Sequence, residues 1–178
     1  TELTLSPSLD FNGSVAISVT VTDGEYTDSD VFTIVVLPVN DAPEMDLPGS
    51  VVFSEDGDIT EDFSDYIDDI DEDALTLTAS GHENVEVLID SFTVTFSSVQ
   101  DWNGTESVVF TIDDSQGRAV DTDTISVTVT PVNDAPALSE IGDQVTDEDT
   151  DFTLDISSSD VDIATNGQTL FYSASSNN

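Results

Sequence analysis

The chain has almost no basic residues: its 178 residues include one Lys or Arg against 39 Asp and Glu, for a formal net charge of -38. Electrostatic repulsion at this charge excludes nucleic acid and anionic membrane surfaces as partners. Self-repulsion also opposes a compact fold, yet 37% of the residues are hydrophobic. Bound divalent cations would reconcile these two facts, so cations are the expected partners.

Cysteine is absent, which excludes disulfides and thiolate metal sites. No apolar run approaches the roughly 18 residues that a membrane-spanning helix needs, so direct membrane contact is not expected. With no Lys, no Cys and a single His, catalysis would depend on Ser or on paired acids. Acid pairs are too abundant here to be informative, so no catalytic residue is predicted and the protein is not expected to be an enzyme.

One hexapeptide organises the chain. Pro-Val-Asn-Asp-Ala-Pro occupies residues 38–43, the first joint, and returns 93 residues later at residues 131–136, the second joint. Its prolines fix φ and remove backbone donors, while Asn and Asp supply oxygens at a bend. The spacing matches one β-sandwich domain of about 100 residues, so each hexapeptide is interpreted as a stiff connection within a tandem array.

Apolar residues alternate with polar ones in short runs. Residues 15–21 and 32–36 alternate on either side of a turn at 23–25, which predicts two half-buried strands. The same pattern recurs at 108–112 and 125–129. Residues 1–41 are therefore interpreted as the C-terminal half of a repeat.

Residues 42–134 form the one complete repeat. The expected fold class is all-β, with tandem antiparallel Greek-key β-sandwiches, because each strand has one apolar face to bury. Trp102 corresponds to Phe11 of the preceding repeat and is expected to close the end of the core. Seven short strands are predicted, at 51–53, near 59, and at 75–79, 85–89, 92–96, 107–113 and 122–129.

Residues 135–178 restart the repeat and supply the early strands of a further domain. This C-terminal half and the N-terminal half are complementary, so the tail of one copy could complete the head of the next. Head-to-tail self-association is one expectation. The alternative is that each half remains an incomplete edge, or that missing chain completes it, which would leave a monomer.

Acidic motifs recur with the joints. Asp-aromatic-Asn-Gly precedes each joint, at residues 10–13 and 101–104, and Asp-x-Asp follows each joint, at 69–71 and 160–162. An extended segment would point both acids of Asp-x-Asp to the same side. Carboxylates converging on one joint would repel by several kcal/mol at an effective dielectric near 20, which implies a bound ion such as calcium. The alternative is that the hexapeptide is only a turn and Asp-aromatic-Asn-Gly only a tight bend.

Residues 127–136 and 19–24 resemble the closing strands and linker of cadherin-like tandem repeats, which are Ig-like β-sandwiches of bacterial calcium-dependent surface proteins and adhesins. The resemblance implies that both joints bind Ca²⁺, although Pro38 and Pro131 stand where the family linker begins with Asp. The implied ligands of the first joint are Asp10, Asn12, Asn40, Asp41, Asp69, Asp71 and Asp114. Those of the second joint are Glu55, Asp101, Asn103, Asn133, Asp134, Asp160 and Asp162.

The resemblance implies an extracellular or cell-surface module that acts as a rigid spacer or in adhesion. Its partners would be neighbouring repeats of the same chain, with a cell-surface protein or a polysaccharide as candidate ligands. The alternative is a carbohydrate-binding accessory module of a secreted polysaccharide-degrading enzyme. A sugar platform needs exposed aromatic residues, and besides Phe the sequence offers Trp102, Tyr26, Tyr66 and Tyr172.

Overall fold

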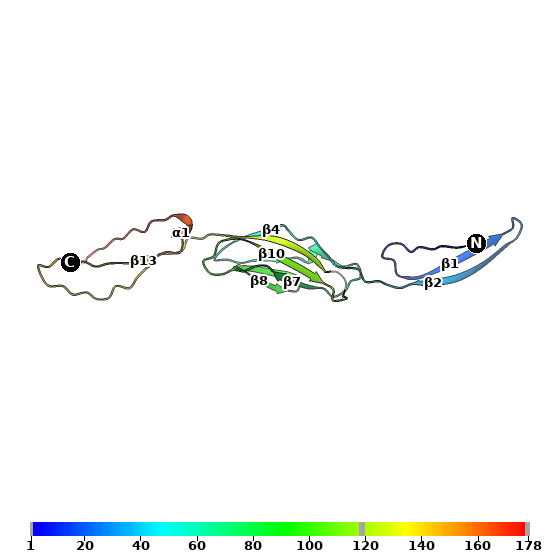
Figure 1. Cartoon of the computed structure of the whole chain (residues 1–178), viewed down its shortest axis with the longest axis horizontal. Helices are drawn as coiled ribbons and strands as arrows, with labels where there is room; N and C mark the ends of the chain where they lie inside the picture. The colour runs from blue at the N-terminus through cyan, green and yellow to red at the C-terminus, as the bar shows by residue number, and fades with distance from the viewer. Residues whose placement is uncertain (1, 118–119, 177–178) are drawn as a thin grey trace.

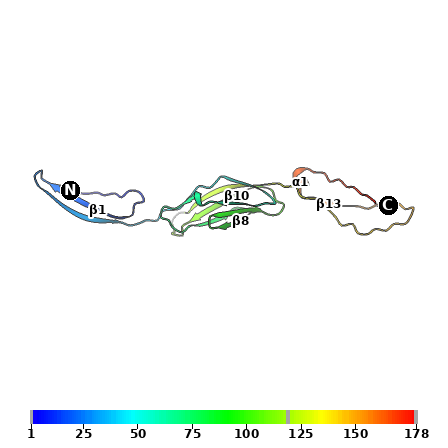
Figure 2. The same ribbon diagram turned by 180° about the vertical axis from the view of Figure 1, so that it is seen from behind.

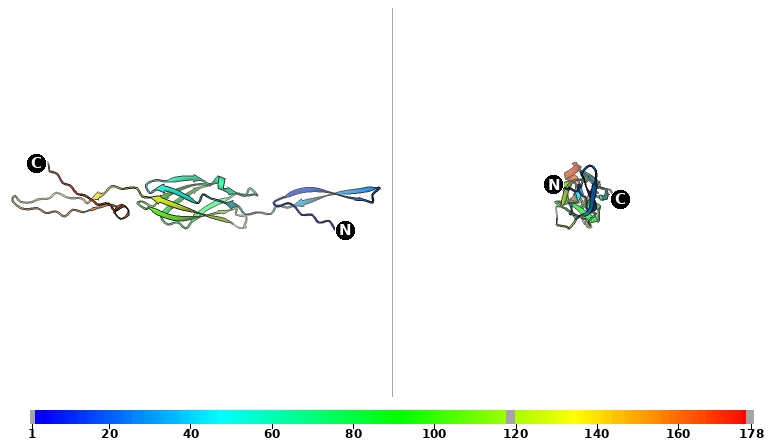
Figure 3. Two further views of the ribbon diagram at one scale, coloured as in Figure 1. Left: turned by 90° about the horizontal axis from the view of Figure 1, so that it is seen from above. Right: turned by 90° about the vertical axis from the view of Figure 1, so that its right-hand side faces the viewer.

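The computed structural model describes residues 2–117 and 120–176. It has an elongated shape, with an N-terminal β-hairpin, a central β-sandwich and an extended C-terminal segment in a line (Figure 1). The reverse view and the end-on view show the same order and a narrow cross-section (Figures 2 and 3). Within the described residues, no helix has the length and apolar character needed to cross a membrane.

Two sheets form the central sandwich, which confirms the predicted all-β class. The first sheet has the order β4-β11-β10-β7, in which β4 runs parallel to β11 and the other pairs are antiparallel. The second has the order β5-β9-β8, and the short strands β3 and β6 pair beside them. Their bounds are β3 Glu44–Met45, β4 Ser50–Ser54, β5 Ile59–Asp62, β6 Ile67–Asp68, β7 Thr76–Ser80, β8 Val85–Asp90, β9 Thr93–Ser98, β10 Gly104–Asp113 and β11 Asp121–Thr130, with a 3-10 turn at Ser64–Tyr66.

Alternate residues of the long strands build the core. Phe110 of β10 lies between Phe63 and Phe96 in edge-to-face contacts, with ring centroids 5.6 and 6.1 Å apart. Each such contact contributes about 0.5–1.5 kcal/mol beyond the apolar area that it buries. Trp102 is half-buried and packs against this core, as expected from the sequence.

The N-terminal hairpin repeats the geometry of β10 and β11. Strand β1 (Gly13–Thr22) pairs with β2 (Thr27–Val36), and Gly13 faces Val36 just as Gly104 faces Val129. No second sheet covers the hairpin within the described chain. Phe32 of β2 is therefore 41% exposed, whereas its counterpart Ile125 is fully buried.

The C-terminal segment contains two-residue strands, β12 (Ala137–Leu138) and β13 (Ser158–Ser159), and a short helix α1 (Ile163–Asn166). The sequence predicted the first strands of a further repeat here, but residues 139–157 form no strand. The reason is visible in the central sandwich, where β4 needs β11 as its hydrogen-bonding partner. The C-terminal segment contains no equivalent of β11.

Candidate metal centres at the two joints

The first joint is tied to the central sandwich by its own amides. Asn40 Nδ2 donates to Oδ2 of Asp114 and to the carbonyl of Asp41, both at 2.7 Å. The backbone N–H of Asp41 donates to Oδ2 of Asp71 at 2.7 Å. Asp114 is buried, and the Asn40 side chain, followed by the amide of Gln116, lowers the pKa of its carboxyl. Two acidic loops of the sandwich therefore converge on the linker.

The Asp69-x-Asp71 motif adopts a turn, so the expectation of an extended segment was wrong. Both the Asp71 and the Asp73 amides donate to Oδ1 of Asp69, at 2.9 and 3.3 Å. This turn directs the carboxylates to one side, and ligand oxygens of all three acids lie within 4.8 Å of one another. Oδ2 of Asp69 is buried and has no hydrogen-bond partner among the described residues.

The second joint repeats this arrangement. The N–H of Asp134 donates to Oδ2 of Asp162 at 2.5 Å, and the N–H of Asp162 donates to Oδ1 of Asp160 at 2.9 Å. Asn133 Nδ2 donates to the carbonyl of Asp134 at 2.8 Å, as Asn40 does to that of Asp41. In the described chain, Oδ2 of Asp134 and Oδ2 of Asp160 are buried without a hydrogen-bond partner.

Glu55 follows the last residue of β4 and connects that end of the sandwich to the second joint. Its buried carboxylate accepts the Val132 amide at 2.5 Å through Oε1 and the Asn103 side-chain amide at 3.1 Å through Oε2. The chain following β11 is thereby fixed to the turn that precedes β10. Each carboxylate oxygen of Glu55 can accept one further contact beyond these two bonds.

Negative charge accumulates around Asp134. Burial, and then the charges of Asp56, Asp101, Asp162 and Glu55, raise the pKa of its carboxyl. Asp56 was not among the predicted residues, although the Glu-Asp pair that contains it recurs at residues 148–149. Asp73 at the first joint was not predicted either, although Asp-x-Asp continues there as Asp-x-Asp-x-Asp.

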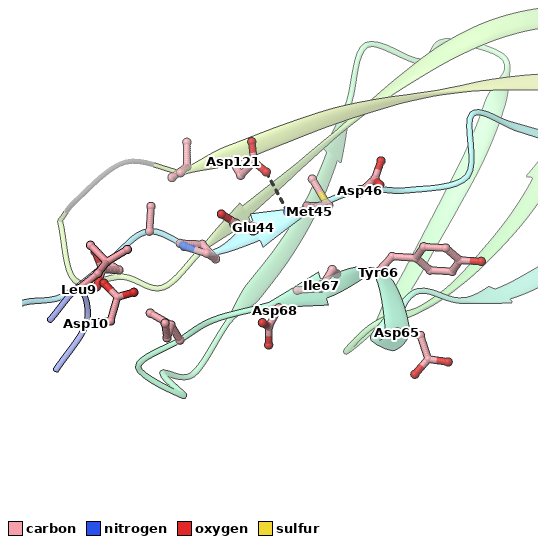
Figure 4. Close-up of a pocket in the computed structure, with 15 residues that line it drawn as sticks. Leu9, Asp10, Glu44, Met45, Asp46, Asp65, Tyr66, Ile67, Asp68 and Asp121 are labelled. Carbon is pink, nitrogen blue, oxygen red and sulfur yellow. Dashed lines mark hydrogen bonds between the residues drawn. The ribbon is translucent and has the colours of Figure 1, made fainter.

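The Asp-aromatic-Asn-Gly motifs form matching turns. Asp10 and Asp101 have φ values of 56° and 58°, and the aromatic residue that follows each donates its amide three residues back. Asp10 and Asn12 line a hollow of about 410 Å³ together with Asp41 and Asp71. Figure 4 shows Asp10 at one end of a larger neighbouring hollow of about 980 Å³, beside β3 and β6.

The structure thus brings the predicted residues together in two groups. Hydrogen bonds connect most members, whereas Asp10 and Asn12 lie at the rim of the first group and Asp101 reaches the second through its charge. The first group consists of Asp10, Asn12, Asn40, Asp41, Asp69, Asp71 and Asp114. The second group consists of Glu55, Asp101, Asn103, Asn133, Asp134, Asp160 and Asp162.

The chemistry of these groups fits a hard divalent cation. All the donors are carboxylate, amide or backbone oxygens, which are the ligands that calcium prefers. Three buried carboxylate oxygens have no donor among the described residues, and one basic residue in the whole chain cannot neutralise so many acids. Buried charge without a partner is costly, and a cation at each joint would bind these carboxylate oxygens and neutralise their charge.

A family model for the bacterial Ig domain matches residues 40–130. The chain belongs to the bacterial Ig domain family. The match begins at Asn40 in the first joint and ends at Thr130, the last residue of β11. The bacterial Ig domain is thus the central sandwich, and one candidate metal centre lies at each of its ends.

Comparison with solved structures finds endo-fucoidan hydrolases of glycoside hydrolase family 107. A variant of MfFcnA4 has 17% identity and a TM-score of 0.42, over 77% of this chain and 21% of that one. MfFcnA4 itself has 22% identity and a TM-score of 0.39, over 71% of this chain and 20% of that one. MfFcnA9 has 16% identity and a TM-score of 0.37, over 70% of this chain and 23% of that one. The chain spans about a fifth of these proteins. No curated protein matches it.

Proposed function

We propose that this chain is a calcium-binding segment of an extracellular protein, in which cadherin-like joints make consecutive bacterial Ig domains into a rigid spacer. The observation that carries the proposal is the repeated arrangement at the joints. At both, the linker amide binds the second acid of Asp-x-Asp, and the first acid retains a buried Oδ2 without a described partner.

Calcium would act by replacing repulsion with shared coordination. Its six to eight oxygen ligands allow one ion to hold the linker, the acid turn after it and the turn before it at the same time. At both joints, hydrogen bonds hold the linker amide against the acid turn, so the ligands that the ion needs already lie together. The ion therefore stiffens a preformed joint, and the β-sandwich itself folds independently of it.

The elongated shape supports a spacer role. The three parts lie in a line with the chain termini at opposite ends (Figure 1). Bacterial Ig domains are typically non-catalytic modules of extracellular or surface proteins, which supports the proposed location. Neighbouring repeats would be the direct partners, and adhesion to a cell-surface protein or a polysaccharide would be carried by other parts of a longer protein.

The positions of the aromatic rings do not support the carbohydrate-binding alternative. Tyr26 lies at the tip of the hairpin, Tyr66 in the 3-10 turn and Tyr172 in the C-terminal segment, so these exposed rings do not form a common platform. Trp102 is half-buried against the core.

Titration calorimetry of metal-free protein with calcium tests the proposal. We expect saturable binding with dissociation constants of about 10⁻⁴–10⁻³ M, and a rise in Tm that corresponds to about 2.7 kcal/mol per site at 100 times that concentration. Magnesium should substitute poorly, because it requires a smaller octahedral shell.

The matched variants are Asp160→Asn with Asp162→Asn, and Asp151→Asn as the control outside both groups. The double variant should bind calcium more weakly than the unmodified chain, and the control should bind it equally well. Equal behaviour of both, or a Tm that does not respond to chelator, would show that calcium only screens surface charge.

A further inference from the structure

An acid pair on β11 holds the segment that begins the central sandwich. Oδ2 of Asp121 accepts the Met45 amide at 2.8 Å, and Oδ2 of Asp123 accepts the Leu47 amide at 2.7 Å; Figure 4 shows the first of these bonds. Oδ1 of each acid accepts the amide of the residue that follows it. The pair therefore binds alternate N–H groups of an extended segment.

The hairpin carries the same pair without the segment. Asp28 and Asp30 of β2 occupy the places of Asp121 and Asp123, and their Oδ1 atoms accept the amides of Ser29 and Val31 at 3.0 and 2.9 Å. Among the described residues, no group donates to their Oδ2 atoms. The hairpin therefore has two acceptors in the conformation that binds β3 in the central repeat.

The apolar face of the hairpin is only partly covered. Val19 of β1 is 44% exposed, whereas its counterpart Phe110 is fully buried. On the same side, Val15, Ile17, Ile34 and Val36 line a hollow of about 300 Å³, whose other wall is residues 5–8 and Phe11 of the preceding segment. A sandwich half that is open in this way needs the early strands of a repeat to cover it.

The C-terminal segment has those early residues in a partly formed state. Its β12–β13 ladder repeats the β3–β6 ladder, and the Ser139 amide donates to the Ser157 carbonyl as the Asp46 amide donates to that of Tyr66. Leu138 is 59% exposed where its counterpart Met45 is 8% exposed, and Ile156, shortly before β13, is 43% exposed. The ladder that sits on β11 in the central repeat therefore exists here without a sheet beneath it.

The two terminal segments lie at opposite ends of the elongated chain (Figure 1), so they cannot cover each other within one molecule. We propose that the C-terminal segment of one copy docks on the β1–β2 hairpin of a second copy. The amides of Leu138 and Glu140 then bond to Asp28 and Asp30, while Leu138 and Ile156 cover the apolar face. This proposal does not depend on calcium binding.

The contact is head-to-tail and does not close. The two joints of the central sandwich lie at its opposite ends (Figure 1), so a sandwich rebuilt from two copies places those copies on opposite sides of it. Such a heterologous contact leaves one free head and one free tail at each step. Assemblies therefore grow in length with concentration.

Sedimentation velocity of the full chain across a concentration series tests this, in calcium and in chelator, with enough salt to screen the charge. The weight-average mass should at least double from the 19.0 kDa of one chain in both conditions. A mass that stays at one chain at every concentration overturns the proposal.

Three variants locate the contact. Ile34→Ser on the inner face of β2 and the double variant Asp28→Ala with Asp30→Ala should restore the monomer, whereas Val35→Ser on the outer face should assemble as the unmodified chain does. Hydrogen exchange of the β1–β2 amides confirms that each hairpin remains paired. Assembly that survives both inner-face changes means that another surface is responsible, and it refutes the contact.

Discussion

The backbone amide of Asp41 donates a 2.7 Å hydrogen bond to the carboxylate of Asp71, 30 residues further along the chain. Asp134 makes the equivalent bond to Asp162 at 2.5 Å. Each bond crosses from a linker to the acid turn of the following domain. Either joint can therefore rotate only if this amide separates from this carboxylate, and both groups belong to residues that are partly or fully buried.

Asp71→Ala should release the amide of Asp41. A hydrogen bond to a charged group contributes about 1.5–3 kcal/mol, so hydrogen exchange at that amide should accelerate by about 10- to 100-fold. The amide of Asp134 serves as the internal control and should keep its rate. Asp162→Ala should give the reverse pattern, and acceleration of both amides by either variant would contradict independent joints.

Asp134→Asn should have opposite effects with and without calcium. Burial and neighbouring negative charges raise the pKa of Asp134, so its contribution to stability is present at acid pH and is lost as the pH rises through the raised pKa. At neutral pH in chelator, the neutral side chain should raise Tm. In calcium it should weaken binding, because one carboxylate is lost. A Tm that falls in chelator would contradict the repulsion.

Glu106→Gln should destabilise the central sandwich at neutral pH by about 2 kcal/mol. Partial burial raises the pKa of Glu106, but the amides of Glu83, Asn84 and Val85 and the Asn84 side chain outweigh it and lower the pKa to about 2. This stabilisation is present above the ordinary pKa of 4.5 and is lost as the pH falls toward 2. Urea unfolding at several pH values measures it.

Glu86→Gln is the matched control for that variant. Glu86 is exposed on β8 and accepts a single long bond from Ser97 Oγ, at 3.4 Å. Its replacement should change the free energy of unfolding by less than about 0.5 kcal/mol. An equal loss in both variants would point to general charge effects instead of the Glu106 hydrogen bonds.

Trp102→Ala should lower stability by about 3 kcal/mol, the low end for a core aromatic, because the ring is half-buried. Retention on polysaccharide columns should be unchanged. Loss of retention at constant Tm would instead favour the carbohydrate-binding alternative. Differential scanning calorimetry and affinity chromatography give the two readings on one sample.

The long strands could be predicted from the sequence because each has one buried face. Alternation at residues 108–112 and 125–129 marks β10 and β11, and the copies at 15–21 and 32–36 mark β1 and β2. Strands β3 and β6 are two residues long and show no period. The carboxylate of Asp121 accepts the amide of Met45 and so fixes β3 in place. No local pattern in the sequence predicts a hydrogen bond between residues so far apart.

Repetition in the sequence marked both joints, but it did not indicate their local geometry. Asp69 and Asp71 converge through a turn built by Asp69's own carboxylate, and alternation along a strand is not involved. Asp56 and Asp73 were missed because acidic residues are so common in this chain that one more carries no signal. Only the folded arrangement distinguishes those near a joint from those facing solvent.

The parallel pairing of β4 with β11 determines how the sandwich bears tension. The chain enters through β3, continues into β4 at Ser50 and leaves after Thr130 at the end of β11. Strands β4 and β11 align from Ser50 beside Ser126 to Ser54 beside Thr130. Pulling on the two joints drives the strands past each other, so their evenly spaced hydrogen bonds are loaded together in shear and do not open one at a time. The strand pair is a mechanical clamp, and an array of such domains resists stretching between its anchor points.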